Sequence, residues 1–117
     1  MVITSLDFQQ ARIKQVLFKS RLRSVLYGVR EADAELFSLQ HNPLGQWLQT
    51  VVKPHYSGRP EVRELERALQ RMLDTGRELA DQYRRGQLEE ARAGLERIDI
   101  HAAQIEELLQ RLERNAS

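Results

Sequence analysis

The side chains that could perform acid–base or metal chemistry in this chain of 117 residues are few and far apart. Its three histidines are His41, His55 and His101, and none has a second histidine three or four residues away. Such a pair, or Glu-x-x-His, is the usual mark of a metal site built from helices. The absence of cysteine also removes thiolate ligands and thiol nucleophiles. We therefore expect each histidine to be a surface or loop residue, and a metal site made of all three is disfavoured.

Catalytic and nucleotide-binding motifs are missing as well. The sequence has no glycine-rich phosphate loop, no His-Glu-x-x-His helix and no serine elbow. Titratable residues do not cluster on any apolar face, as those of an enzyme pocket between helices would. The sequence therefore predicts a chain that is not an enzyme and that uses no cofactor and no metal.

Composition excludes further classes of protein. Hydrophobic residues make up 41% and charged residues 30%, which is too apolar for a disordered chain. A formal net charge of +1 gives no general attraction to nucleic acid. No apolar run of about 18 residues and no secretory leader is present, so we expect a cytoplasmic protein that does not insert into membranes.

The elements that must position these residues are helices. Few glycines and prolines interrupt the chain, and apolar residues recur at alternating intervals of three and four, the spacing of packed helices. The first segment, 5–27, begins at a cap formed by Thr4 and Asp7, ends before Gly28, and has one polar residue, Gln15, on its apolar stripe. That stripe comprises Phe8, Ala11, Phe18, Leu22, Val25 and Val29, and Ile13, Val16, Leu17 and Leu26 widen it.

Two further long helices are expected at 60–86 and 87–114, the first opened by Pro60. Between them and the first helix, residues 29–39 suggest a loop or one or two helical turns, residues 41–48 a turn that opens a short helix, and residues 53–60 a loop. Three long helices and one short helix predict an all-α, antiparallel four-helix bundle in a single domain, 1–117. The first 30 residues hold six Lys and Arg against one Asp, whereas 87–117 are acidic, which favours placing these helices side by side within the bundle or across a dimer.

Three stretches resemble the chemoreceptor zinc-binding (CZB) domain family of bacterial signalling proteins. They are residues 11–19 (ARIKQVLFK), residues 42–47 (NPLGQW) and residues 68–79 (ALQRMLDTGREL). The sharpest of them is the Leu-Gly-x-Trp element anchored by Gly45 and Trp47, although a lone tryptophan is also a sufficient core anchor. The resemblance covers roughly residues 8–112 and implies a cytoplasmic four-helix fold that commonly forms homodimers.

The family binds Zn²⁺ through three histidines and one cysteine, and the resemblance aligns those ligands with Gln15, Asn42, Leu69 and Leu73. Amide and hydrocarbon side chains cannot replace imidazole and thiolate. The resemblance therefore implies a member that has lost its metal site. We also expect Gln15 and Asn42 to be partly buried, where the two amides could hydrogen-bond to each other.

Two functions remain open. The resemblance implies a non-catalytic signalling module, as in chemotaxis, that acts through protein–protein contacts as a homodimer or on an effector domain. The alternative is a small-molecule sensor in which Trp47, Tyr56 or Tyr83 lines a pocket at the former metal site.

Overall fold

The structure is a computed structural model that describes residues 3–56 and 58–116. Every regular element in these two ranges is helical and none is a strand, which confirms the all-α prediction. Three helices are long: α1 (Ser5–Leu26), α4 (Pro60–Arg84) and α6 (Leu95–Ala116). The shorter elements are η1 (Ala34–Phe37), α2 (Pro43–Trp47), η2 (Leu48–Val52), α3 (Lys53–Tyr56) and α5 (Leu88–Ala93).

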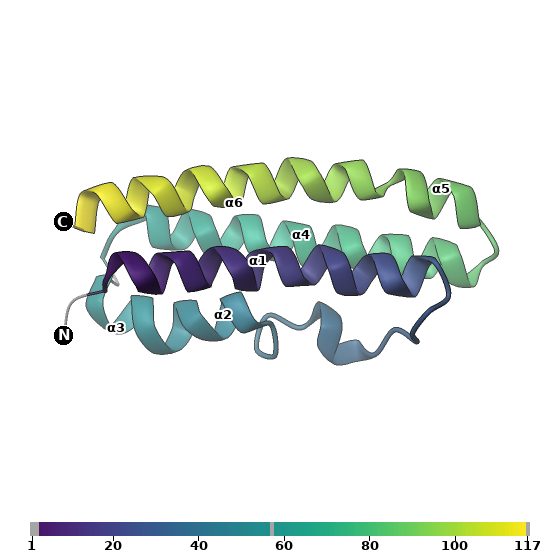
Figure 1. Cartoon of the computed structure of the whole chain (residues 1–117), viewed down its shortest axis with the longest axis horizontal. Helices are drawn as coiled ribbons and strands as arrows, with labels where there is room; N and C mark the ends of the chain where they lie inside the picture. Colours follow the sequence, from purple (N-terminus) through teal and green to yellow (C-terminus); the bar gives the residue numbers. More distant parts are fainter. Residues whose placement is uncertain (1–2, 57, 117) are drawn as a thin grey trace.

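The helices lie along one axis of an elongated molecule measuring 47 × 22 × 21 Å (Figure 1). Helices α1 and α4 run in the same direction, and the run from α2 to α3 and the run from α5 to α6 return in the other (Figure 1). Ion pairs between helices agree with this course. Arg12, early in α1, pairs with Glu113 near the end of α6, whereas Lys19, later in α1, pairs with Asp99 near its start.

The signals that begin and end α1 act as the sequence predicts. The Thr4 hydroxyl accepts a hydrogen bond from the Asp7 amide at 3.3 Å, and the Asp7 carboxylate accepts one from the Thr4 amide at 2.8 Å. This reciprocal pair satisfies amides that the first helical turn leaves without partners. Gly28 follows the helix with a φ of +75°, a backbone conformation that favours glycine.

The core forms where the apolar seams of the long helices meet. From α1 it receives the predicted seam from Phe8 to Val25, and from α4 the residues from Val62 to Ala80 that face inward. These two helices come close at Gly76, where an added Cβ would lie 2.6 Å from Cζ of Phe18. Helix α6 completes the core with Ile98, Ile105, Leu108, Leu109 and Leu112.

Part of the predicted α1 stripe does not face the core. Leu26 is buried, but Ile13 and Val16 are 63% and 62% exposed, and Leu17 is also exposed. Val29, expected to continue the seam, is 77% exposed because the helix has ended before it. The prediction that these four residues pack into the bundle is wrong, since one helix in a bundle buries only the side that faces its neighbours.

The last predicted helix is interrupted. Gly94 separates α5 from α6: its amide still donates to the Glu90 carbonyl oxygen at 3.0 Å, but its ψ of −11° departs from the α-helical value. A Cβ at Gly94 would lie only 2.2 Å from Cδ2 of Leu79, so the backbone here comes very close to α4. The continuous helix predicted over 87–114 is therefore wrong at one residue.

The loop predicted over 53–60 is mostly helix. From Pro43 the chain stays helical through η2 and α3 to Tyr56, and Ser57 lies outside the described residues. The turn η2 is wound more widely than an α-helix, and it precedes Pro54, whose ring would clash with the carbonyl four residues earlier in regular α-helix. A widened turn lets the helix continue through a proline that the sequence-based prediction treated as a break.

Candidate functional site

Phe18 marks the level of the bundle at which the former metal-site positions lie. Its ring is edge-on to Phe37, with 6.3 Å between centroids, and it is the side chain that a Cβ at Gly76 would meet. Phe18 also lines a small cavity of about 20 Å³ together with Asn42. Gln15 lies three residues before Phe18 on α1, and Leu73 lies three residues before Gly76 on α4. Because the two helices run in the same direction, Gln15 and Leu73 share a level, which Asn42 approaches from the start of α2 (Figure 1).

The two amides at this level are both buried. Gln15 is 8% exposed and Asn42 is 4% exposed. The side-chain oxygen Oδ1 of Asn42 accepts hydrogen bonds from the backbone amides of Leu44 at 2.9 Å and Gly45 at 3.0 Å, which caps helix α2. No hydrogen bond joins the two amide side chains within the described residues. Asn42 thus has a structural task that does not involve Gln15.

The other two positions are hydrocarbon. Leu69 and Leu73 are 0% exposed and belong to the hydrophobic core. A leucine side chain has no lone pair to offer a metal ion, and the Asn42 oxygen is already engaged by two backbone amides. The donor set at this level therefore does not fit Zn²⁺.

Gly45 and Trp47 hold α2 in place. A Cβ at Gly45 would lie 2.2 Å from the Leu39 carbonyl oxygen. The backbone at Leu39 therefore comes so close to α2 that only a glycine fits at position 45. Trp47 is 5% exposed and meets Phe8 edge-on, with 5.6 Å between ring centroids. These contacts make the Gly-x-Trp element a packing device that joins the start of α1 to α2.

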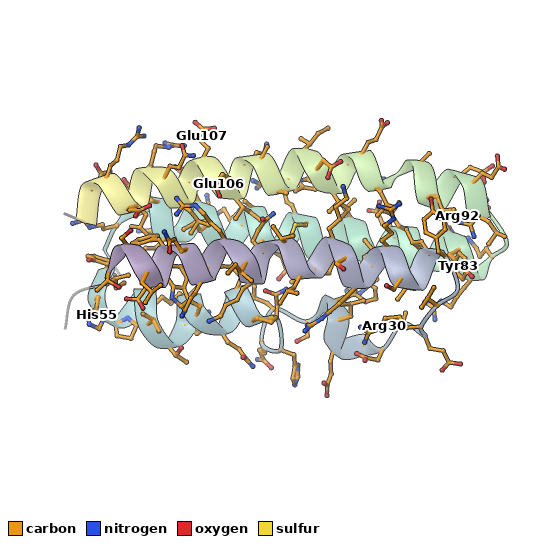
Figure 2. All side chains as sticks on the ribbon, in the orientation of Figure 1. Arg30, His55, Tyr83, Arg92, Glu106 and Glu107 are labelled. Carbon is orange, nitrogen blue, oxygen red and sulfur yellow. The ribbon has the colours of Figure 1, made fainter. Side chains whose placement is uncertain are left out.

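The three histidines stay on separate elements. His41 is exposed in the turn before α2 with its Nδ1 3.0 Å from Ser38 Oγ, and His55 is exposed on α3 (Figure 2). Among the residues that the structure describes, no three His, Asp or Glu side chains gather closely enough to hold a metal ion.

His101 departs from the surface position that the sequence suggests. It is half-buried between α6 and α4, and its Nε2 lies 3.1 Å from the Thr75 hydroxyl oxygen. Its Nδ1 is buried without a hydrogen-bond partner among the described residues. Burial lowers the pKa of His101, and the positive charges of Arg71 and Arg97 act in the same direction.

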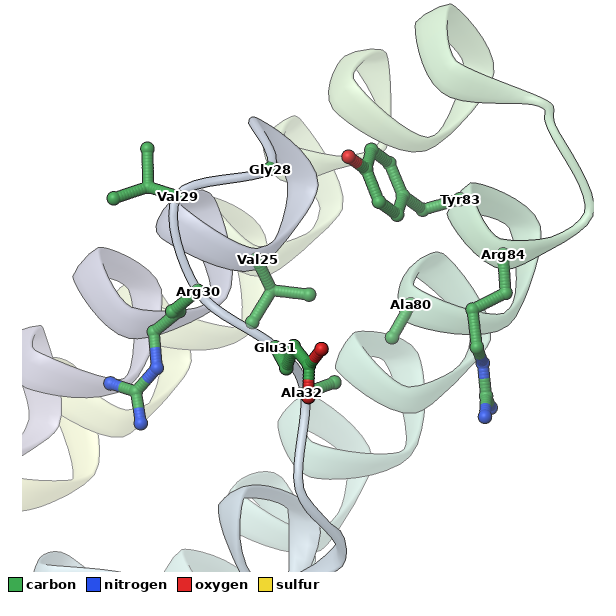
Figure 3. Close-up of a pocket in the computed structure, with 9 residues that line it drawn as sticks. All are labelled: Val25, Gly28, Val29, Arg30, Glu31, Ala32, Ala80, Tyr83 and Arg84. Atoms are coloured by element: carbon green, nitrogen blue, oxygen red, sulfur yellow. The ribbon is translucent and has the colours of Figure 1, made fainter.

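One pocket lies away from the former metal-site level. A pocket of about 580 Å³ opens between the end of α1, the loop after it and the end of α4, with Val25 and Ala80 among its lining residues (Figure 3). Tyr83 lines it too, whereas Trp47 packs on Phe8 and Tyr56 lies under Arg59, whose guanidinium carbon is 5.0 Å from the ring centroid. Of the three aromatic residues that the sequence offers as alternatives for a pocket at the former metal site, Tyr83 lines a pocket, and that pocket lies elsewhere.

Helix α1 has an apolar outer side that the sequence-based prediction does not separate from the core stripe. Leu6, Ile13, Val16 and Leu17 lie exposed on this side. A signal for it was available, because Leu6, Ile13, Ser20 and Tyr27 are each seven residues apart.

No family model, curated protein or solved structure matches this chain. In the described residues, no helix combines the length and the apolar character that crossing a bilayer requires. The resemblance to the CZB family therefore depends on residues 11–19, 42–47 and 68–79 alone.

Proposed function

We propose that this chain is a non-catalytic bacterial signalling module, similar to a CZB domain that has exchanged its zinc site for packing, and that it acts through protein–protein contacts. The observation that carries the proposal is the burial of all four positions that the resemblance aligns with zinc ligands. They are Gln15, Asn42, Leu69 and Leu73, which are all buried. Side chains at metal-ligand positions inside a bundle point inward in this way.

The proposal assigns each position a role in the absence of metal. Leu69 and Leu73 supply core volume, and Asn42 supplies the cap of α2. The module then depends on its helix packing alone, and a signal would pass as a small shift of one helix against another. Partners in this view are a second copy or an effector domain in the cytoplasm rather than nucleic acid, and a role in chemotaxis follows from the resemblance.

The decisive experiment restores the ligands. The fourfold variant Gln15→His, Asn42→Cys, Leu69→His and Leu73→His should bind one Zn²⁺ per chain, measured by calorimetry and by metal analysis of untagged protein. The unmodified chain should bind none under the same conditions. Binding would raise the melting temperature of the variant, because a metal held only by the folded state stabilises it.

A matched control moves one ligand off the site. The control variant carries Gln15→His, Asn42→Cys and Leu73→His together with Gln70→His, and it keeps Leu69. It has the same number of candidate ligands, but one of them lies on the neighbouring face of α4, so stoichiometric zinc binding should be lost. Equal zinc binding by the fourfold variant and this control would contradict the alignment, and so would a fourfold variant that folds but binds no zinc. Stoichiometric metal in the unmodified chain would overturn the proposal directly.

A second candidate function is favoured by the pocket of about 580 Å³ beside Val25 and Ala80, which has the size of a small-molecule site. In this reading the chain is a sensor whose ligand binds at the end of α1 and α4 rather than at the former metal site. Native mass spectrometry of protein isolated from its own host would then show a bound small molecule. The ligand should be lost in Ala80→Phe, which fills the pocket floor.

A further inference from the structure

The pocket beside Val25 and Ala80 has an apolar inner wall. It measures about 580 Å³ and lies between the end of α1, the loop that follows and the end of α4. Val25 is 4% exposed and Ala80 is 2% exposed, so both side chains belong to the closed bottom of the pocket. The ring of Tyr83 lines the pocket beside them. These groups can hold only the apolar part of a ligand, and the polar groups at the rim must decide which kind of ligand binds.

One carboxylate at the rim belongs to the pocket. Glu31 lines it from the loop after α1, and Figure 3 shows this carboxylate on the side of the loop that faces α4. Among the described residues Glu31 has neither a hydrogen-bond partner nor an ion-pair partner. Its charge is therefore free to pair with a charged group of a ligand.

The two arginines that also line the pocket do not offset this charge. Arg84 forms an ion pair with Asp81, one turn earlier on α4. Arg30 also lines a separate cavity of about 120 Å³ together with Glu35, and Figure 3 shows its guanidinium pointing away from α4. The charge that remains directed at the pocket is that of Glu31.

Tyr83 supplies an aromatic face and a second polar group. Its hydroxyl oxygen lies 3.0 Å from the position that a Cβ at Gly28 would take, so the ring reaches across to the start of the loop. The hydroxyl has no hydrogen-bond partner among the residues that the structure describes. The face of an aromatic ring attracts a positively charged group. Both Tyr83 and Glu31 therefore favour a cation in this pocket.

We infer that the pocket binds a small organic amine, a molecule with an apolar body and one protonated amino group. The body lies against Val25, Ala80 and the ring of Tyr83. The ammonium group pairs with the Glu31 carboxylate, and hydrogen bonds between such charged groups are stronger than those between neutral ones. The inference rests on the second candidate function, that of a small-molecule sensor, and names the class of its ligand.

Charge disfavours the other two classes of ligand. A neutral ligand that covered the pocket would take water from the Glu31 carboxylate without replacing its hydrogen bonds, which costs free energy. An anionic ligand would be repelled, because residues 31–35 hold three carboxylates and no Lys or Arg. Selection among molecules of the same shape should therefore follow charge.

Three matched probes test this selection. Phenethylamine, hydrocinnamate and phenethyl alcohol carry the same phenyl ring on the same two-carbon chain and differ only in a positive, negative or neutral end group. Calorimetry of the untagged full chain at neutral pH should show one phenethylamine bound per chain. Its affinity should exceed that of each other probe by about tenfold or more, the worth of one hydrogen bond between charged groups. Nuclear magnetic resonance should show phenethylamine shifting the methyl signals of Val25 and Ala80.

A charge reversal tests the role of Glu31. In Glu31→Lys, hydrocinnamate should bind more tightly than phenethylamine. Glu35→Lys is the matched control: it makes the same change of charge four residues later, at a residue that lines two smaller cavities but not this pocket. This control should keep the preference for the amine. Both glutamates are exposed, so the circular dichroism of both variants should match that of the unmodified chain.

Equal binding of the three probes, or no binding of phenethylamine, would overturn the inference. A reversal of preference in Glu35→Lys as complete as in Glu31→Lys would also overturn it, since the charge of the whole loop and not Glu31 would then select the ligand. The sensor function has its own test. A neutral or acidic compound found by native mass spectrometry, and lost in Ala80→Phe, would refute the amine and retain the sensor, whereas protein isolated without any bound compound would contradict the sensor itself.

Discussion

His101 and Thr75 make a polar contact between α6 and α4. The imidazole is half-buried, its Nδ1 has no hydrogen-bond partner among the described residues, and two arginines lie near it. A neutral imidazole is tolerated in such a place more readily than a charged one. A half-buried histidine of this kind makes the free energy of unfolding depend on pH, whether or not it belongs to a functional site.

The pH dependence of stability should report this histidine. Its pKa is lowered in the folded chain by burial, whereas in the unfolded chain it keeps its ordinary value of about 6.5. The unfolded state therefore binds the proton more readily, and the free energy of unfolding should fall as the pH drops below about 6.5 and level off below the native pKa. Urea melts between neutral and mildly acidic pH would measure this. His101→Gln should show a smaller decline, and equal declines would contradict the assignment.

Asn42 acts through its side-chain oxygen Oδ1, which accepts hydrogen bonds from two backbone amides at the start of α2. Asn42→Ala should lower the free energy of unfolding by about 0.5–2 kcal/mol, the usual cost of losing an N-cap. Asn42→Asp, which keeps an acceptor at the same position, should cost clearly less. Chemical denaturation of the three proteins provides the comparison, and equal losses in both variants would show that the cap contributes little.

At the scale of elements, glycines decide how closely helices and their connections approach. Gly45, Gly76 and Gly94 lie where a Cβ would meet a neighbour at 2.2–2.6 Å. Only at Gly45 is that nearest neighbour backbone, the Leu39 carbonyl oxygen, which cannot turn away as a side chain can. The position of α2 therefore depends on one missing methyl group.

Gly45→Ala should consequently destabilise the protein by about 1–3 kcal/mol or more, the range observed when atoms are forced into packed space. Gly58→Ala is the matched control, because no atom lies within 4 Å of a Cβ at that position. Thermal unfolding should show a clearly lower melting temperature for the first variant and little change for the second. Similar melting temperatures would contradict the close approach of Leu39.

At the scale of the whole molecule, four segments distant in sequence meet at the level of Phe18. Ion pairs of α1 and α4 with α6 surround the core, but most involve partly exposed side chains, and such pairs contribute little each. The apolar core therefore supplies most of the stability. Its centre includes the two leucines at former ligand positions.

A charge placed there tests this view of the core. Leu69 is fully buried, so Leu69→Asp should lower the free energy of unfolding by about 3–5 kcal/mol, as expected for an unpaired buried charge. The same change at the exposed residue Arg71 should be mild. Circular dichroism and denaturation curves would compare them. A melting curve unchanged by Leu69→Asp would contradict the register of α4.

Much of the fold could be predicted from the sequence because its signals are local. The Thr4–Asp7 cap, the stop at Gly28, the start at Pro60 and the buried seams of α1 and α4 all depend on residues within a few turns of each other. Burial of Leu69 followed from the same periodicity, and the former metal-site positions came from the resemblance.

The sequence-based predictions were wrong where burial or helix continuity depends on a residue far away in the sequence. Periodicity shows that Ile13, Val16 and Leu17 are apolar, but only the tertiary structure shows that the neighbours of α1 cover its other side. The break at Gly94 depends on Leu79, and the partner of His101 is Thr75, 26 residues away. The sequence by itself determined where the three long helices lie, apart from the break at Gly94, because capping and periodicity act within one helix. Tertiary packing alone decided which side of each helix is buried, because burial depends on what lies across from it.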